Sequence, residues 1–335
     1  MRLVQTLGRI TSWRLESSAS NTRSSTETPA YIIMTVHVFG NVAVDEFFHV
    51  KAIPAPGQSM RVQARHRDLG GKGANQAIIT ARAGIDVRLI SFVGNDDMGL
   101  WAERQLAAEG LGLGSLARCH GSSDVSVIVV DESGENIIVT TDGAAGHLTS
   151  TMVEAHICQA HAGDILLLQG NFSPTVTGHA LQCGRIHGLT QVFNPSPVHP
   201  EFSSTWSLLD LAVLNQAEAL ELTGEPDVHS AGRCILANGA RQVVITLGRA
   251  GAILMDHSAL HEIPAAPIIP VDATGAGDTF AGILVAVLAR TGTIDARAVV
   301  AATEAAAVTV SRPGTRSAFP TREEILAILA RYDLA

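Results

Sequence analysis

The segment at residues 272–278, Asp-Ala-Thr-Gly-Ala-Gly-Asp, places an acid directly after small residues at what reads as the start of a helix. An apolar stretch at 281–288 follows and is long enough to form a buried helix. The first amides of a helix are unpaired and partly positive, so they favour an anion such as a phosphate. The amides of this expected anion hole are those of Gly275, Ala276 and Gly277. Asp278 beside them could accept the proton of an attacking hydroxyl. Taken alone, the segment also fits an ordinary capped helix start.

The composition narrows the class of protein. The chain has 335 residues and a net charge of −9, with a pI of about 5.8, which argues against nucleic acid as a partner. Hydrophobic residues make up 46%, but there is no uninterrupted apolar window of about 18 residues, so no membrane span is expected. Wide spacing of the cysteines is typical of reduced thiols in a cytoplasmic protein, and structural zinc is not expected. These cysteines are Cys119, Cys158, Cys183 and Cys234.

Histidine is frequent, with 13 residues, but the histidines show no spacing typical of a metal site. His156 and His161, for example, are five residues apart, which does not place them on one helical face. We therefore expect all the histidines to be structural or surface residues.

Residues 1–33 differ from the rest of the chain. They are rich in Ser, Thr and Arg and lack the apolar region of a secretion signal. Met34 lies just before the first strand-like run at 36–39 and could be a second start codon. We expect residues 1–33 to be a disordered or artefactual extension and residues 34–335 to form the folded domain. A transit peptide is an alternative for this composition.

From residue 36 onward, short β-branched runs alternate with helical patterns, which predicts a parallel sheet with helices on both faces. The predicted strands are 87–92, 165–169, 191–194, 211–215 and 242–246, and the predicted helices are 74–83, 97–109, 175–186 and 231–238. Two segments, 47–68 and 126–141, alternate without an intervening helix. They predict antiparallel, hairpin-like strands outside the main sheet, forming a small β-lid over a site at the carboxyl ends of the strands.

A second glycine-rich segment, Gly-Gly-Lys-Gly-Ala-Asn-Gln at 70–76, precedes a helical run. It fits neither a phosphate-binding loop nor a dinucleotide fingerprint. Together with 272–278, however, it resembles the ribokinase (PfkB) family of carbohydrate kinases. Segment 70–76 agrees with that family's amino-terminal signature at every residue, and 272–278 agrees with its carboxy-terminal signature except at Ala273. The resemblance spans about residues 36–330 and implies a ribokinase-like three-layer αβα sandwich with a β-lid.

The resemblance implies ATP-dependent phosphorylation of a primary hydroxyl of a small sugar, with Asp278 as the catalytic base. The implied sugar-binding residues are Asp45, Gly71, Lys72, Asn75, Asn171 and Asp278, and the implied ATP-binding residues are Asn215, Thr246, Gly248, Gly251 and Gly277.

The resemblance also implies two metal ions. Glu218 would help to hold Mg²⁺ through its waters, in the pattern Asn-x-x-Glu that begins at Asn215. Alone, this pattern also fits a helix cap followed by a solvated Glu. The ligands implied for a monovalent cation, K⁺, are the Asp272 carboxylate and the carbonyls of Thr274, Thr309, Arg312 and Gly314. Ala318 stands where the family often has a serine hydroxyl.

Two sugar contacts expected of a ribokinase are missing. Asp45 matches the family Asp that binds sugar hydroxyls from the end of the first strand, but Ala43 and Asn171 replace an Asn and a Glu. Losing two such contacts costs on the order of several kcal/mol. We therefore expect that ribose is not the preferred substrate.

Other functions and partners stay open at this point. The alternatives are a nucleoside kinase of the same fold, with a base in the vacated space, and a catalytically silent sugar or nucleotide sensor. Lid residues at 61–67 could read a larger or anionic sugar, or simply solvate a strand edge. Exposed lid edges also predict a homodimer through the lid.

Overall fold

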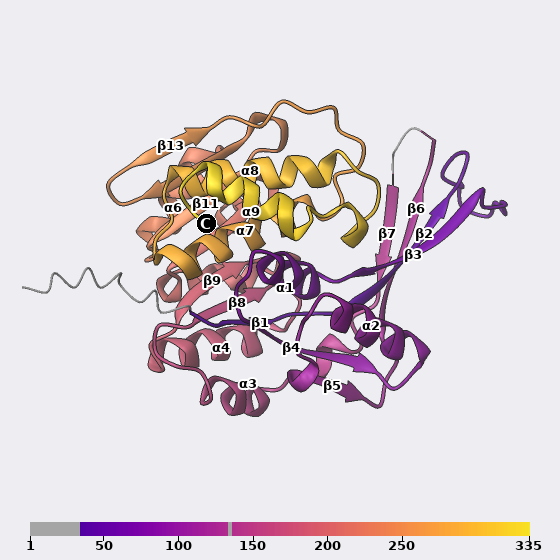
Figure 1. Ribbon diagram of the computed structural model, residues 1–335, viewed down its shortest axis with the longest axis horizontal. Coiled ribbons are helices and arrows are strands. Elements are labelled where there is room, and N and C mark those ends of the chain that lie inside the picture. The colour runs from indigo at the N-terminus through magenta and orange to yellow at the C-terminus, as the bar shows by residue number, and fades with distance from the viewer. Residues whose placement is uncertain (1–33, 133–135) are drawn as a thin grey trace, which may run out of the picture. The chain divides into compact units, whose positions relative to one another are not determined.

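A nine-stranded sheet forms the centre of this computed structural model, which describes residues 34–132 and 136–335 (Figure 1). Its strand order is β13-β12-β11-β10-β9-β8-β1-β4-β5. Neighbours from β11 to β5 pair in parallel, whereas β12 and β13 add an antiparallel edge. The strands are β1 (Val36–Phe39), β4 (Val87–Gly94), β5 (Leu116–Cys119), β8 (Ile165–Gln169), β9 (Thr190–Asn194), β10 (Leu211–Asn215), β11 (Gln242–Thr246), β12 (Ala252–Asp256) and β13 (Leu260–Ile263).

Helices cover both faces of this sheet because its central strands are apolar on both sides. In β8, Ile165 and Leu167 enter one core while Leu166 and Leu168 enter the other, as the two-residue period of a strand requires. The first core also takes residues from α1 (Lys72–Arg82), α2 (Asp97–Ala108), α7 (Ala276–Thr291), α8 (Ala296–Val310) and α9 (Arg322–Arg331). The second takes them from α3 (Ser150–Ile157), α4 (Pro174–Ile186), α5 (Gln216–Thr223) and α6 (Val228–Ala237).

A separate four-stranded sheet, in the order β3-β2-β6-β7, forms the lid (Figure 1). It consists of β2 (Ala43–His49), β3 (Ala64–Gly70), β6 (Asp124–Val130) and β7 (Asn136–Thr140). Each predicted segment forms an antiparallel pair, β2 with β3 and β6 with β7, and the parallel pairing of β2 with β6 joins the two. The lid prediction is therefore confirmed, with residues 50–63 forming a loop rather than strand.

The position of Asp45 differs from the expectation. We expected it at the end of the first strand of the main sheet, but β1 ends at Phe39 and Asp45 lies in the lid strand β2. The alternating pattern from Ala43 onward pairs with β3 and β6, so the lid begins earlier than residue 47.

The predicted strands and helices of the α/β body are present with small shifts of their ends. Helix α1, for example, begins at Lys72 rather than Ala74. The antiparallel edge formed by β12 and β13 was not predicted. Among the described residues, no helix combines the length and apolar character that crossing a membrane requires. The prediction for residues 1–33 lies outside the described residues.

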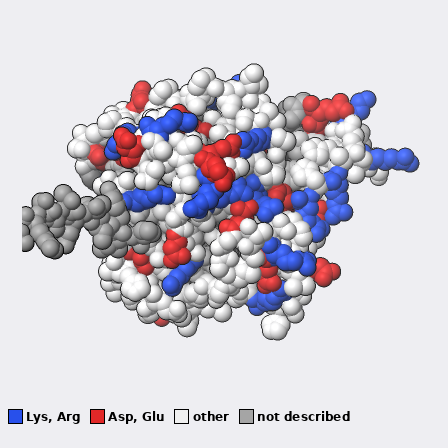
Figure 2. Space-filling view, viewed as in Figure 1, with Lys and Arg blue, Asp and Glu red and all other residues white. Residues whose placement is uncertain are grey.

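Acidic and basic side chains intermingle on the face shown in Figure 2 rather than forming a region of one sign. On the lid, Arg65 and Arg67 both pair with the buried carboxylate of Glu46. This pairing favours the structural reading of the lid arginines over sugar recognition.

Candidate active site

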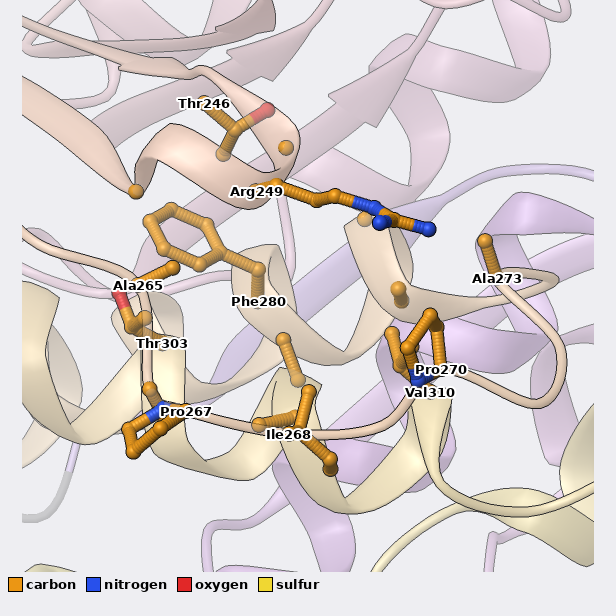
Figure 3. A pocket seen from close by; sticks show the side chains of 17 residues that line it. Thr246, Arg249, Ala265, Pro267, Ile268, Pro270, Ala273, Phe280, Thr303 and Val310 are labelled. Carbon is orange, nitrogen blue, oxygen red and sulfur yellow. The ribbon is translucent and has the colours of Figure 1, made fainter.

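Two cavities meet at the start of α7. The first, the α7–α8 cavity, has a volume of about 490 Å³ and is lined by Thr246, Gly248, Arg249, Gly251, Ala273, Ala276, Gly277 and Phe280, among others (Figure 3). The second, the lid cavity, has about 660 Å³ and is lined by Asn41, Asp45, Gly71, Lys72, Asn75, Asn171, Asp272, Ala273, Thr274, Gly275, Asp278 and Thr315, together with residues of β6 and β7. Ala273 lines both, so the loop before α7 separates one cavity from the other.

The start of α7 has the unpaired amides that the sequence predicts. Gly275 is the N-cap, with a left-handed φ of 77°, and a Cβ there would lie 2.6 Å from Cε1 of Phe319. The Ala276 amide donates to the Ala273 carbonyl at 3.2 Å. The amides of Gly275 and Gly277 have no hydrogen-bond acceptor in the described part of the chain. Two of the three expected anion-hole amides are thus fully free to bind an anion.

Asp278 lies on the first turn of α7 and is only 6% exposed. Its Oδ2 accepts a hydrogen bond from Nδ2 of Asn75 at 2.8 Å, and its Oδ1 accepts one from Nε2 of Gln76 at 2.9 Å. Both donors lie on α1. Two amides therefore fix the orientation of the carboxylate at the edge of the lid cavity.

An amide network ties Gln76 to the ends of two central strands. Nε2 of Gln76 also donates to Oδ1 of Asn194 at 3.0 Å, and its Oε1 accepts from Nε2 of Gln169 at 2.9 Å. Gln169 ends β8 and Asn194 ends β9. Sequence reasoning missed these three residues, although polar residues ending two predicted strands were a signal that could have found them.

The glycines of segment 70–76 permit close contacts around the lid cavity. A Cβ at Gly70 would lie 2.2 Å from Oδ2 of Asp45, and one at Gly73 would lie 2.5 Å from backbone atoms of Gly40. A side chain at either position would push α1 away from β1 or displace the Asp45 carboxylate. The glycines are needed here for space rather than for binding phosphate.

Asp45 is 5% exposed and accepts a hydrogen bond from Oγ1 of Thr315 at 3.0 Å. The pKa of Asp45 is raised to about 6, chiefly by burial. Hydrogen bonds from Thr315 and Ser126 partly offset this rise, and the charges of Asp68 and Asp278 add to it. The side chain can therefore change its protonation state near neutral pH.

Asparagines surround the rest of the lid cavity. Oδ1 of Asn75 and Oδ1 of Asn171 are buried without a hydrogen-bond partner among the described residues, so both can accept a bond from a ligand hydroxyl. Ala43 does not line this cavity, whereas Asn41 does. The sequence analysis missed Asn41 because it looked for the family's Asn only at position 43, where the chain has Ala43.

The residues predicted to hold a monovalent cation are partly brought together. Oδ1 of Asp272 accepts from the Thr274 amide at 2.9 Å, and Oδ2 accepts from the Gly314 amide at 3.1 Å. The carbonyls of Thr274, Arg312 and Gly314 accept no hydrogen bond among the described residues, whereas the Thr309 carbonyl accepts one from the Arg312 amide at 3.1 Å. An oxygen-only donor set with free carbonyls fits a hard cation.

Asn215 and Glu218 form a reciprocal cap at the start of α5. Oδ1 of Asn215 accepts from the Glu218 amide at 2.9 Å, and Oε2 of Glu218 accepts from the Asn215 amide at 2.8 Å. Neither residue lines either cavity. The helix cap that this pattern fits when taken alone is therefore present, and Glu218 lies outside both cavities.

Comparison with known proteins gives consistent matches over nearly the whole chain. The family model described as pfkB family carbohydrate kinase matches residues 35–322. The chain is 32% identical to a ribokinase from Haemophilus influenzae over 301 residues, covering 88% of this chain and 98% of that protein. It is 28% identical to a deoxyribokinase from Salmonella typhi over 298 residues, covering 87% and 97%. The crystal structure of a ribokinase from Thermotoga maritima matches with a TM-score of 0.80 at 27% identity, covering 89% of this chain and 99% of that one.

Proposed function

The chain belongs to the pfkB family of carbohydrate kinases, and we propose that it transfers the γ-phosphoryl group of ATP to a primary hydroxyl of a small sugar. The observation that carries this proposal is the wall shared by the two cavities. Asp278 and Gly275 line the lid cavity and Gly277 lines the α7–α8 cavity, so each cavity has one of the two free amides of the helix start. A phosphoryl group moving from one cavity to the other must pass this point.

In this mechanism the sugar occupies the lid cavity and ATP occupies the α7–α8 cavity. Asp278 takes the proton from the sugar hydroxyl as its oxygen attacks the γ-phosphorus in line, and the bond to the β–γ bridging oxygen breaks to leave ADP. The amides of Gly275, Ala276 and Gly277 stabilise the charge on the transferring group. Closure of the lid would exclude water, which would otherwise compete with the sugar as the acceptor.

The α7–α8 cavity has the features that a nucleotide needs. Thr246, Gly248 and Gly251 lie in and around the turn between β11 and β12, and Arg249 extends from this turn toward Ala273 (Figure 3). An Arg in this position could neutralise a phosphate, and the apolar wall formed by Phe280 and the α8 side chains suits a base. Asn215 would act indirectly, by capping the helix that presents Glu218.

Two ions belong to the proposal. Glu218 would hold Mg²⁺ through its waters, and Asp272 with the carbonyls of Thr274, Thr309, Arg312 and Gly314 would hold K⁺. When bound, such ions supply positive charge beside the phosphates and the anion hole.

The acceptor is proposed to be a sugar other than ribose. Asp45, Lys72, Asn75 and Asn171 would bind its hydroxyls, with the backbone of Gly71 close to the ring. An amide at Asn171 binds a hydroxyl less strongly than the carboxylate that ribokinases carry there, because charged acceptors make the stronger hydrogen bonds. The Salmonella typhi relative named as a deoxyribokinase makes deoxypentoses the first sugars to test.

A substrate panel tests the proposal. ADP release would be measured with ribose, deoxyribose, hexoses and nucleosides as acceptors, in Mg²⁺ with and without K⁺. More ADP release with another sugar than with ribose supports the proposal. ADP release with nucleosides alone would show that the acceptor is a nucleoside rather than a free sugar. No acceptor-dependent release across the panel would favour a sensor.

The partners in this proposal are small molecules and a second copy of the chain. Val127, Ile137 and Val139 are 38%, 47% and 63% exposed and face away from the lid cavity, because their neighbours Ser126, Ile128 and Ile138 line it. Such an apolar lid face favours a homodimer through the lid. Sedimentation should show a dimer that Val139→Lys weakens, while a wild-type monomer at working concentration would contradict it.

The proposed location is the cytoplasm. All four cysteines are free, as is usual where thiols stay reduced. The mixed charges of the face in Figure 2 and the net charge of −9 favour neither nucleic acid nor a membrane surface as a partner.

A further inference from the structure

Glu154, His179 and Cys183 bring three types of metal-ligating side chain together between α3 and α4. Nε2 of His179 lies 2.9 Å from Oε1 of Glu154 and 3.4 Å from Sγ of Cys183. One ligand atom from each residue lies within 4.8 Å of the other two. No other group of three His, Cys, Asp or Glu residues in the described part of the chain is so arranged, and this one lines neither active-site cavity.

The two helices place these side chains on facing surfaces. His179 and Cys183 are four residues apart on α4, so they lie on one face of that helix. Glu154 faces them from α3, and both helices pack on the same core. At the ends of the same helices, Sγ of Cys158 lies 3.7 Å from Nε2 of His187. A search for histidine spacing misses this cluster, because its ligands are of three types and come from two helices.

We propose that Glu154, His179 and Cys183 form a binding site for a divalent cation of the zinc type, with water as the fourth ligand. Thiolate, imidazole and carboxylate are the ligands that zinc takes in proteins. With usual zinc bond lengths, the ligand atoms of a tetrahedral site are about 3.3 to 3.7 Å apart. The pairs at 2.9 and 3.4 Å need only small side-chain movements to reach those separations.

Burial and exposure at the cluster suit an ion that enters from solvent. Cys183 is 9% exposed, whereas the side chains of His179 and Glu154 are 29% and 55% exposed. The thiol thus forms the floor of the site, and the carboxylate lies at its mouth. The exposed side leaves space for the water ligand and a path for the ion.

Binding must move protons at the cluster. Burial, and next the negative charge of Glu154, raise the pKa of the Cys183 thiol, so the thiol holds its proton when no cation is present. A bound cation would displace that proton to solvent, leaving the thiolate as ligand. His179 would bind through the Nε2 lone pair, with its proton on Nδ1.

Zinc titration of the full chain in competition with a chromophoric chelator, without nucleotide, tests the proposal. The wild type should bind one Zn²⁺ that Cys183→Ser and His179→Gln each weaken at least about 10-fold. Matched controls are Cys234→Ser, a thiol outside the cluster, and His229→Gln, from a His–Glu pair at 3.5 Å that has no thiol. Neither control should change the affinity. Wild-type affinity in the two cluster variants would overturn the proposal.

A second measurement identifies the thiolate directly. Substitution with Co²⁺ should give a thiolate-to-metal absorption band in the wild type and in Cys234→Ser, but not in Cys183→Ser. If Cys183→Ser does not fold, the Zn²⁺ affinities of His179→Gln and Glu154→Gln, at more exposed positions, are compared with that of the wild type instead. A Co²⁺ complex of the wild type without the thiolate band would overturn the proposal.

Discussion

Nδ2 of Asn75 donates to Oδ2 of Asp278 at 2.8 Å, although the two residues are 203 positions apart in the chain. This hydrogen bond joins the two glycine-rich segments, one at the start of α1 and the other at the start of α7. Oδ1 of Asn75 has no hydrogen-bond partner among the residues that the structure describes and can accept a bond from the proposed sugar. Asn75 can therefore contact both the proposed base and the acceptor, so sugar binding and orientation of the base would be coupled.

Gln76 is expected to act on the rate through Asp278 rather than on nucleotide binding. Gln76→Leu removes the donor to Oδ1 of Asp278 and the link to β8 and β9. A misplaced catalytic group can lower the rate by up to about 100-fold, so kcat should fall about 10- to 100-fold while KM for ATP changes little. Steady-state kinetics with both substrates would measure this. Gln159→Leu, at an exposed position, is the matched control, and an unchanged kcat in Gln76→Leu would refute the positioning role.

Gly275 and Gly277 should respond differently to substitution by alanine. At Gly275 the left-handed φ of 77° and the contact at 2.6 Å with Phe319 should lower the free energy of unfolding by about 1 to 3 kcal/mol. At Gly277 a Cβ meets no atom within 4 Å, so Tm should change little. Because Gly277 lines the α7–α8 cavity, its methyl group should instead raise KM for ATP. Thermal unfolding and steady-state kinetics would measure both effects. A lower Tm in Gly277→Ala and a raised KM for ATP in Gly275→Ala alone would contradict the roles given to these two glycines.

The pKa of about 6 at Asp45 predicts a pH-dependent step in sugar use. Below that pH the carboxyl group is protonated and loses the stronger, charged form of its hydrogen bonds to sugar hydroxyls. Consequently kcat/KM for the sugar should fall as the pH drops through about 6, and the pH profile of Asp45→Asn should lack this fall. If the fall persists unchanged in Asp45→Asn, another group causes it.

The same group predicts a change in stability. Folding raises the pKa of Asp45 from 3.8 to about 6, so the folded state binds this proton more tightly than the unfolded state. The resulting stabilisation is fully present below pH 3.8 and is lost as the pH rises through about 6. Over this pH range the free energy of unfolding of the wild type should fall by up to roughly 3 kcal/mol relative to that of Asp45→Asn. Urea unfolding of both proteins at several pH values would measure it, and parallel curves would disprove it.

Local patterns in the sequence were enough to predict the α/β body, the lid and the start of α7. Each of these depends on signals within a few residues, such as strand periodicity or a run of small residues before an acid. The strand-end positions of Gln169 and Asn194 could be read from the sequence, but their hydrogen bonds to Gln76 could not, because these depend on how closely α1 approaches β8 and β9. Glycines at 40 and 73 permit that approach, but only the folded chain shows which side chains then meet.

The pairing and register of the lid strands also could not be predicted from the sequence. The alternating pattern marks lid strands, but the parallel pairing of β2 with β6 joins segments that are far apart in the chain. That pairing places Asp45 opposite Ser126 and brings it into the lid cavity. The hydrogen bond between Thr315 and Asp45 could not be predicted either, because nothing in the sequence near Thr315 indicates that it contacts Asp45.

The most direct test of the account is the turnover of Asp278→Asn, measured as sugar-dependent ADP release with the best sugar of the panel. Asp97→Asn, at an exposed position, serves as the matched control, and ADP binding to both variants confirms an intact nucleotide site. The account predicts that Asp278→Asn loses about 10²- to 10⁴-fold in kcat while ADP affinity is unchanged. Turnover of Asp278→Asn close to that of the wild type would contradict the assignment of Asp278 as the base.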